Sequence, residues 1–429
     1  MAGNIRRLTR TLLECNSSDK LCVVRVYQTE VIIIPVFLVG VFVILLGVIL
    51  WLHYRNWKSK QQLLPRYQDV VPLPAKEKNQ QVSHESENAY IQLSETTVES
   101  LLRAAALSLK ELEIPRDRLT PGSLELICSG SFGGIYRAEL KAGNLDTTKT
   151  VILKALQDNT RPREVKDFLG RIKFHQSLGH HDNMVELIGC CTIQTPLYMI
   201  LENVCHGNLL KFLWTCRRDV MTMNGIPYDI TERQVYRVGE NVAAALDFLQ
   251  QKKLFHGDVA ARNVLIQSDF TAKLCGLGLA YETYTYGTSV VTQIVPLKWQ
   301  APEQLLMNHP SIKADIWSFG ILLYEMITLG APPFPQVPPS GILQHLQRKT
   351  VMKRPSTCQP AMYGIMESCW QWSVTDRPSP AELIQHLQIA AKSSNDQVVL
   401  QVPELVVPEL YADVAGVALE SLVRDYTTF

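Results

Sequence analysis

The chain has 429 residues, and its 42 Lys and Arg residues against 41 Asp and Glu residues give a formal net charge of +1. This balance argues against a generic nucleic-acid-binding protein, because such proteins present a clear excess of basic residues. The ten cysteines are scattered without metal-ligand spacing. Two of them, Cys190 and Cys191, are adjacent in an apolar run that predicts buried thiols.

Residues 31–52 form an uncharged stretch of about 22 residues, long enough as a helix to cross a hydrocarbon core of ~30 Å. We expect a single transmembrane helix here, after a short extracellular segment over residues 1–30. The alternatives are a buried helix or a signal-peptide core; the length disfavours the latter. Basic residues concentrate after the stretch, which predicts an outside N-terminus and a cytosolic C-terminal part. A glycosylation sequon at Asn16, and the pair Cys15 and Cys22, fit that orientation.

Residues 53–112 are polar and punctuated by prolines, which predicts a mostly disordered juxtamembrane linker. Its last part, Thr97–Leu112, repeats leucine and alanine at helical spacing. A short amphipathic helix that packs on the following domain is therefore expected.

Phe255–Ala280 holds two loops on either side of an expected β-hairpin, Val264–Ile266 with Ala272–Leu274. The first loop reads HGDVAARN and resembles the protein-kinase catalytic loop H-R-D-L-x-x-x-N. A resemblance to protein kinases, in particular receptor tyrosine kinases, extends over residues 113–391. It implies an α+β, bilobal protein-kinase fold, followed by a tail over residues 392–429.

The resemblance assigns roles within this loop. Asp258 matches the proton acceptor for the substrate hydroxyl, and Asn263 matches a magnesium ligand. Arg262 belongs to the Ala-Ala-Arg form that favours tyrosine substrates. Gly257 replaces an arginine that binds a phosphorylated activation-loop residue in the family.

The same resemblance implies ATP as the cofactor. The segment ICSGSFGGIY is similar to the glycine-rich loop, with Cys128 in place of the first glycine. Lys154 ends a strand that resembles V-A-I-K, and Leu201 matches the gatekeeper that precedes the hinge. The residues expected to bind ATP are Ile127, Gly130, Ser131, Gly133, Ile135, Lys154, Leu201, Glu202 and Val204.

Two positions depart from the family pattern. Gly276 stands where the family has the magnesium-binding aspartate and offers no ligand oxygen, so Asn263 is left as a weak ligand and Mg²⁺ binding is doubtful.

Arg171 stands where the family has a glutamate that pairs with the lysine at position 154. At about 4 Å and an effective dielectric near 20, the two cations would repel by several kcal/mol. We therefore expect an inactive-like helix, with Glu164 as the alternative acid, and His175 at an otherwise apolar position.

Three further motifs indicate a folded C-terminal lobe: PLKWQAPE, DIWSFG and CWQWSVTDRP. In the family, Asp315 supports the catalytic loop from behind and Arg377 pairs with Glu303. The candidate phosphorylation sites are Tyr281, Tyr284, Tyr286, Tyr411 and Tyr426.

Two functions follow from these residues. One is a single-pass membrane protein-tyrosine kinase of weak activity; the other is a pseudokinase scaffold that acts through partner binding and phosphorylated tyrosines. We favour very low or absent turnover. The resemblance implies growth-promoting signalling, with the membrane, signalling proteins that read phosphotyrosine and, if the enzyme is active, a protein substrate as partners, and no nucleic acid.

Overall fold

The structure is a computed structural model that describes residues 38–48, 51, 97–141, 147–157, 160–217, 229–287, 295–307, 311–394, 396, 399–402, 408–416 and 419–422. The chain divides into two units, Met1–Asn88 and Ala89–Phe429. The expected sequon at Asn16, the pair Cys15 and Cys22, most of the linker, and Tyr426 lie outside the described residues.

The expected transmembrane helix over residues 31–52 is contradicted. Within the part of the chain that the structure describes, no helix is both long and apolar enough to cross a bilayer. Residues 38–48 are helical and carry exposed apolar side chains. The predicted sidedness of the chain stays a prediction.

The second unit begins with a five-stranded antiparallel sheet in the order β1-β2-β3-β5-β4. The strands are β1 (Glu125–Ser129), β2 (Gly134–Lys141), β3 (Thr148–Ala155), β4 (Leu187–Cys191) and β5 (Tyr198–Glu202). In the central strand β3, alternate side chains enter different apolar clusters. Ile152 joins the cluster on the α5 side, whereas Val151 and Leu153 join the other. The period of two therefore turns Lys154 toward α5.

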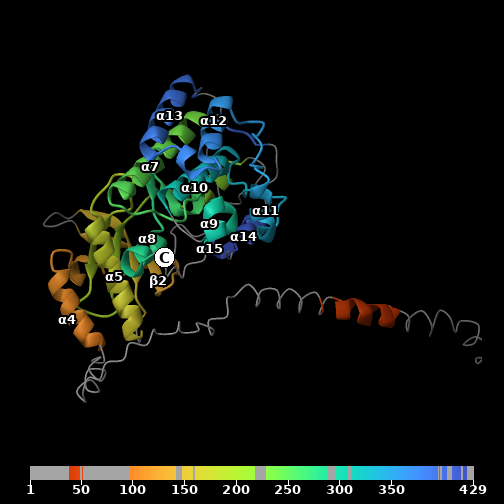
Figure 1. Ribbon diagram of the computed structural model, residues 1–429. Helices are drawn as coiled ribbons and strands as arrows, with labels where there is room; N and C mark the ends of the chain where they lie inside the picture. Colours follow the sequence, from red (N-terminus) through yellow and green to blue (C-terminus); the bar gives the residue numbers. More distant parts are fainter. Residues whose placement is uncertain are drawn as a thin grey trace, which may run out of the picture. The chain divides into compact units, whose positions relative to one another are not determined.

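Helix α5 (Pro162–Leu178) covers that face of the sheet, and α4 (Val98–Ser108) packs beside it (Figure 1). Helix α5 buries Val165, Phe168, Leu169 and Ile172, a stripe at spacings of three and four residues. Helix α4 confirms the predicted amphipathic helix, because it falls within Thr97–Leu112 and buries its Ala105 in this cluster.

The second lobe is helical. Its helices are α6 (Leu209–Thr215), α7 (Glu232–Gln251), α9 (Pro302–Met307), α10 (Ile312–Ile327), α11 (Ile342–Gln347), α12 (Pro360–Cys369) and α13 (Pro380–Ser393). Helix α10 is buried on nearly all sides, as expected for a helix surrounded by others. The Oγ atom of Ser311 caps it by accepting a hydrogen bond from the Ala314 N–H at 3.1 Å.

The segments between the lobes carry the candidate site. The predicted hairpin is confirmed, with β6 (Val264–Ile266) paired to β7 (Ala272–Leu274). Helix α8 (Gly278–Tyr286) follows directly, where the sequence indicated a loop. In the tail, α14 (Pro408–Ala415) and α15 (Leu419–Leu422) lie against the helical lobe near α9 and α11 (Figure 1).

Candidate active site

The catalytic-type loop is held from behind by Asp315 of α10, as predicted. Its carboxylate accepts hydrogen bonds from the backbone N–H groups of His256 and Gly257, both at 2.7 Å. Burial raises the pKa of Asp315 to about 7, although the two donated bonds act in the opposite direction. Nδ1 of His256 accepts from the Asp258 N–H, so its Nε2–H donates to the Cys275 carbonyl at 2.7 Å. The imidazole thereby links the two loops that flank the hairpin.

Asp258, Arg262 and Asn263 come together as predicted. One Asp258 carboxylate oxygen accepts from the Arg262 guanidinium, and the other accepts from Asn263 Nδ2 at 2.7 Å. The guanidinium also lies over the Trp299 ring, 4.6 Å from its centroid. A buried carboxylate held by two donors is oriented as a proton acceptor would need to be.

Lys154, near the end of β3, is nine-tenths buried. The pKa of its ammonium is lowered to about 8, mainly by burial and in part by the Arg171 guanidinium, while Cys275 and Cys128 act in the opposite direction. Burial and the same two cations lower the pKa of His175 to about 3, so this ring is neutral. The cleft therefore concentrates basic groups where the family pattern has an ion pair.

Arg171 is accommodated by partners other than Lys154. Its Nε donates to Asp167, one turn earlier on α5, at 3.1 Å. Its guanidinium carbon lies 5.4 Å from the Phe132 ring centroid and 4.5 Å from that of Tyr281. Arg171 thus joins the glycine-rich loop, α5 and α8. The alternative acid, Glu164, is exposed in the first turn of α5, where its carboxylate accepts from the Arg161 N–H at 3.1 Å.

The metal end of the cleft does not fit a resident Mg²⁺. Gly276 has φ +80°, and a Cβ built on it would lie 2.7 Å from Asn263 Oδ1. The carboxamide of Asn263 therefore fills the space that a side chain at position 276 would need, while its Nδ2 is bonded to Asp258. Among the described residues, no group of three or more His, Cys, Asp or Glu side chains could hold a metal ion. Mg²⁺ in nucleotide sites is usually held by one or two carboxylates together with substrate phosphates and water, and position 276 supplies no carboxylate.

The residues predicted to bind ATP belong to the turn between β1 and β2, to β3, and to β5 with the segment that follows it. Gly130, Ser131 and Gly133 form the turn between β1 and β2, and Ile127 and Ile135 flank it. The turn folds inward, because the Gln157 N–H donates to the Phe132 carbonyl at 2.9 Å. Leu201 and Val204 are buried in the same apolar cluster as Ile135. A buried ammonium below a glycine hairpin fits an anionic triphosphate chemically.

Glu202 is expected to bind adenine through its backbone, and its side chain is engaged elsewhere. Its carboxylate forms a buried ion pair with Lys273 of β7 at 2.7 Å and accepts from the Glu186 N–H at 2.8 Å. The side chain therefore ties β5 to the catalytic hairpin. Only the backbone groups of Glu202 remain available to form hydrogen bonds with the edge of an adenine ring.

Helix α8 packs closely against two glycines, Gly257 and Gly170, at which there is no room for a Cβ atom. A Cβ at Gly257, which has φ +83°, would lie 1.9 Å from Leu279 Cδ2. A Cβ at Gly170, within α5, would lie 2.4 Å from the Tyr281 hydroxyl, which itself donates to the Asp167 carbonyl. An arginine at position 257, as in the family, would clash with Leu279, so α8 can pack here only because this residue is glycine.

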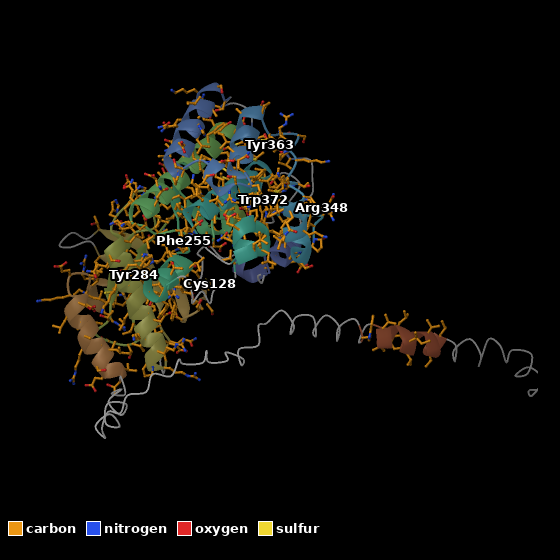
Figure 2. All side chains as sticks on the ribbon, viewed as in Figure 1. Cys128, Phe255, Tyr284, Arg348, Tyr363 and Trp372 are labelled. Atoms are coloured by element: carbon orange, nitrogen blue, oxygen red, sulfur yellow. The ribbon has the colours of Figure 1, made fainter. Side chains whose placement is uncertain are left out.

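The tyrosines named as phosphorylation sites differ in exposure. Tyr281 is buried, whereas Tyr284 and Tyr286 are 59% and 53% exposed; Tyr284 is visible on α8 in Figure 2. Tyr411 of α14 is fully buried between the Trp214 and Trp299 rings, and its hydroxyl bonds Glu325. Neither Tyr281 nor Tyr411 is accessible in this conformation.

Other predictions concern the architecture. Arg377 is buried and makes a bidentate pair with Glu303, at 2.6 and 2.7 Å, as expected. Burial raises the pKa of Cys190 to about 12 and that of Cys191 to about 11, so both are inert buried thiols.

Sequence reasoning missed Asp167, Gly170, Leu279 and Tyr281 as parts of the site. One signal was present: a glycine inside a helix costs about 1 kcal/mol relative to alanine and often has a packing reason. Gly170 is such a glycine, next to the unusual Arg171.

Comparison with known proteins settles the family. Residues 123–387 match the family described as protein tyrosine and serine/threonine kinase. The chain belongs to this protein kinase family. It is 58% identical to the tyrosine-protein kinase STYK1 of Homo sapiens over 98% of this chain and 99% of that one. It is 56% identical to the protein of the same name from Mus musculus, over 99% of both. A fibroblast growth factor receptor from Strongylocentrotus purpuratus is 36% identical over 66% of this chain and 30% of the receptor.

Proposed function

We propose that this protein-kinase-family chain binds ATP in its cleft, transfers the phosphoryl group slowly or not at all, and acts mainly as a signalling scaffold. The observation that carries the proposal is the pair Gly276 and Asn263. No ligand oxygen is available at position 276, and the carboxamide of Asn263 occupies its side-chain space.

Nucleotide binding is supported by the basic character of the cleft. Lys154 is buried, and burial lowers the pKa of its ammonium to about 8. An anionic phosphate beside this group would stabilise its charged form, so binding and protonation favour each other. ATP would supply the phosphoryl group; the chain would supply Lys154 and the hinge backbone to hold it.

Slow transfer is supported by the missing electrostatic partner. Phosphoryl transfer depends on neutralising the charge of the phosphates. Losing one preorganised electrostatic stabiliser typically costs about 2.7–4 kcal/mol, or ~10²–10³ in rate. Loss of a metal-binding carboxylate would cost at least as much.

A weakly active tyrosine kinase is the second candidate, and the intact Asp258–Arg262–Asn263 arrangement favours it. In that case Asp258 accepts the proton of a substrate tyrosine. Under either candidate, growth-promoting signalling would run through partners that read exposed phosphotyrosines such as Tyr284 and Tyr286.

The two candidates are separated by a transfer assay on the purified chain with ATP, Mg²⁺ and a tyrosine peptide. We expect turnover at background, unchanged by Asp258→Asn. Turnover that Asp258→Asn abolishes would overturn the scaffold proposal and establish the weak kinase.

A further inference from the structure

A cavity of about 520 Å³ lies in the helical lobe, between the start of α7, the start of α12 and the end of α13 (Figure 1). Its volume is typical of pockets that hold small molecules. Much of its wall is uncharged, and this part includes Pro360, Ala361, Ala390, Ser393, Ser394 and Leu400. Among the described residues that line the cavity, Glu232 alone carries a charge.

Glu232 is the first residue of α7 and is only 8% exposed. Its carboxyl group accepts hydrogen bonds from the Gln359 backbone N–H and the Tyr236 hydroxyl. Its Oε1 atom, however, is buried without a hydrogen-bond partner among the residues that the structure describes. Burial raises the pKa of Glu232, while the two donated bonds act in the opposite direction. A glutamate is almost never fully buried unless it is paired, so this carboxylate requires a further donor.

The position of Glu232 at a helix start does not by itself explain its burial. The partial positive charge at the first turn of a helix favours a carboxylate there, but this attraction needs no cavity. Glu382 in the first turn of α13 is an example, because its carboxylate is exposed and accepts from the Ser379 N–H at 2.7 Å.

The neighbouring cation of α7 is already engaged by the tail. Arg233 lies 3.6 Å from the Asp396 carboxylate and donates to the Ser394 carbonyl at 3.1 Å. The tail then continues along α7, where the Leu400 N–H donates to the Ile230 carbonyl at 2.8 Å. Leu400 thus forms one wall of the cavity, and the charge of Glu232 is left without a cationic partner in the described part of the chain.

We propose that this cavity is a binding site for a small organic amine, whose ammonium group donates to Glu232 and whose apolar part contacts Ala361, Ala390 and Leu400. An ammonium group is a donor without acceptor capacity, and its bond to a carboxylate is charge-assisted. The terminal torsion of a glutamate side chain is broad, so a small rotation presents Oε1 to the ligand. A neutral ligand would leave the buried charge unpaired, and an anionic ligand would be repelled by it.

The test uses the full chain and probes that share one ring but differ in charge: 4-fluorobenzylamine, 4-fluorobenzyl alcohol and 4-fluorobenzoate. Their dissociation constants are measured by ¹⁹F NMR titration at pH 7.5. We expect the amine to bind about tenfold more tightly than the alcohol, because a hydrogen bond between charged groups is the stronger one. The benzoate should not displace the amine.

Three variants assign the binding to this cavity. Glu232→Gln keeps the size of the side chain and should weaken the amine to the affinity of the alcohol. Glu382→Gln removes the same charge from the same lobe, away from the cavity, and should leave both affinities unchanged. Ala390→Leu places a larger side chain in the cavity and should weaken both probes, so it tests the site without altering Glu232.

Hydrogen exchange locates the bound amine. Peptides that contain Leu400 or Gln359 should exchange about twofold more slowly with the amine, whereas those of α5 should be unchanged. Equal affinities of amine and alcohol, or an amine preference that survives Glu232→Gln, would overturn the proposal. The absence of saturable amine binding would also overturn it and would mean that water is the partner of Glu232.

Discussion

Lys154 and Arg171 are two cations placed where electrostatics disfavours them, and the residues around them explain how the fold tolerates this. Asp167 neutralises Arg171 from one turn away, and the Phe132 and Tyr281 rings stack on the guanidinium. Burial leaves the ammonium of Lys154 with a pKa of about 8. Its charge in the empty cleft is therefore sensitive to pH near neutrality.

The pH dependence of nucleotide binding follows from this pKa. An anionic nucleotide raises the pKa of Lys154, so binding takes up a proton and affinity should fall as the pH rises through about 8. Calorimetric titration with ATP in EDTA between pH 7 and 9.5 should show the decline. Lys154→Arg, which stays charged, should bind with little dependence on pH, and a wild-type affinity that is constant over this range would contradict the assignment.

Gly257 offers a second test with a defined geometry. Gly257→Ala places a methyl group 1.9 Å from Leu279 Cδ2 at a backbone φ of +83°, so we expect unfolding free energy to fall by about 2–4 kcal/mol. In a Leu279→Ala background the same change should cost only about 1–2 kcal/mol, because the conformational strain remains while the clash is gone.

Gly364→Ala is the control, because a Cβ there meets nothing within 4 Å and the residue lies within α12. It should raise stability by about 0.5–1 kcal/mol. Urea denaturation measures the unfolding free energies of the wild-type protein, the two single variants, their double variant and Gly364→Ala. Additive effects of Gly257→Ala and Leu279→Ala would mean that α8 does not pack on this loop.

At the scale of elements, the hairpin β6–β7 and helix α4 were predictable from sequence, whereas α8 was not. The hairpin has apolar runs bounded by turn residues, and α4 has leucines at helical spacing. Helix α8 is buried on several sides near its start and has no clear apolar stripe. Its position depends on close packing against Gly170 and Gly257, which belong to segments distant from α8 in the sequence.

The sequence predicts Tyr411 of the tail as a phosphorylation site, yet α14 buries this tyrosine below the catalytic-type loop. The Glu325 carboxylate accepts from the Tyr411 hydroxyl and from the Ala261 N–H at 3.0 Å. Nothing in the local sequence of the tail encodes this contact, because its partners lie on α10 and in the catalytic-type loop.

Tyr411→Phe removes one donor to a buried carboxylate and keeps the ring. We expect unfolding free energy to fall by about 1–3 kcal/mol, the usual cost of leaving a buried polar group without its partner. Tyr284→Phe, at an exposed position of α8, should change it by less than about 0.5 kcal/mol. Chemical denaturation of the two variants checks this; equal stabilities would mean that the tail is not docked through Tyr411.

At the scale of the whole molecule, the order of motifs was enough to predict two lobes with a cleft between them. Asp258, Arg262 and Asn263 met as expected, since a short loop fixed by Asp315 brings them together. The partners of Arg171 and the side chain of Glu202 could not be predicted. Each depends on packing between elements, which spacing along the chain does not determine.

The expected transmembrane helix is the clearest failure of sequence reasoning at this scale. Hydropathy measures only whether a stretch is apolar enough to cross a bilayer. In the described residues the helical stretch is too short to do so.

The most direct test of the account is the affinity of the purified chain for ATP, measured by calorimetry at pH 7.5 in Mg²⁺ and again in EDTA. Because the space at position 276 holds the Asn263 carboxamide and no carboxylate, we predict dissociation constants that agree within about twofold. Binding that is tenfold or more tighter with Mg²⁺ would show that other oxygens hold the ion and would contradict the account.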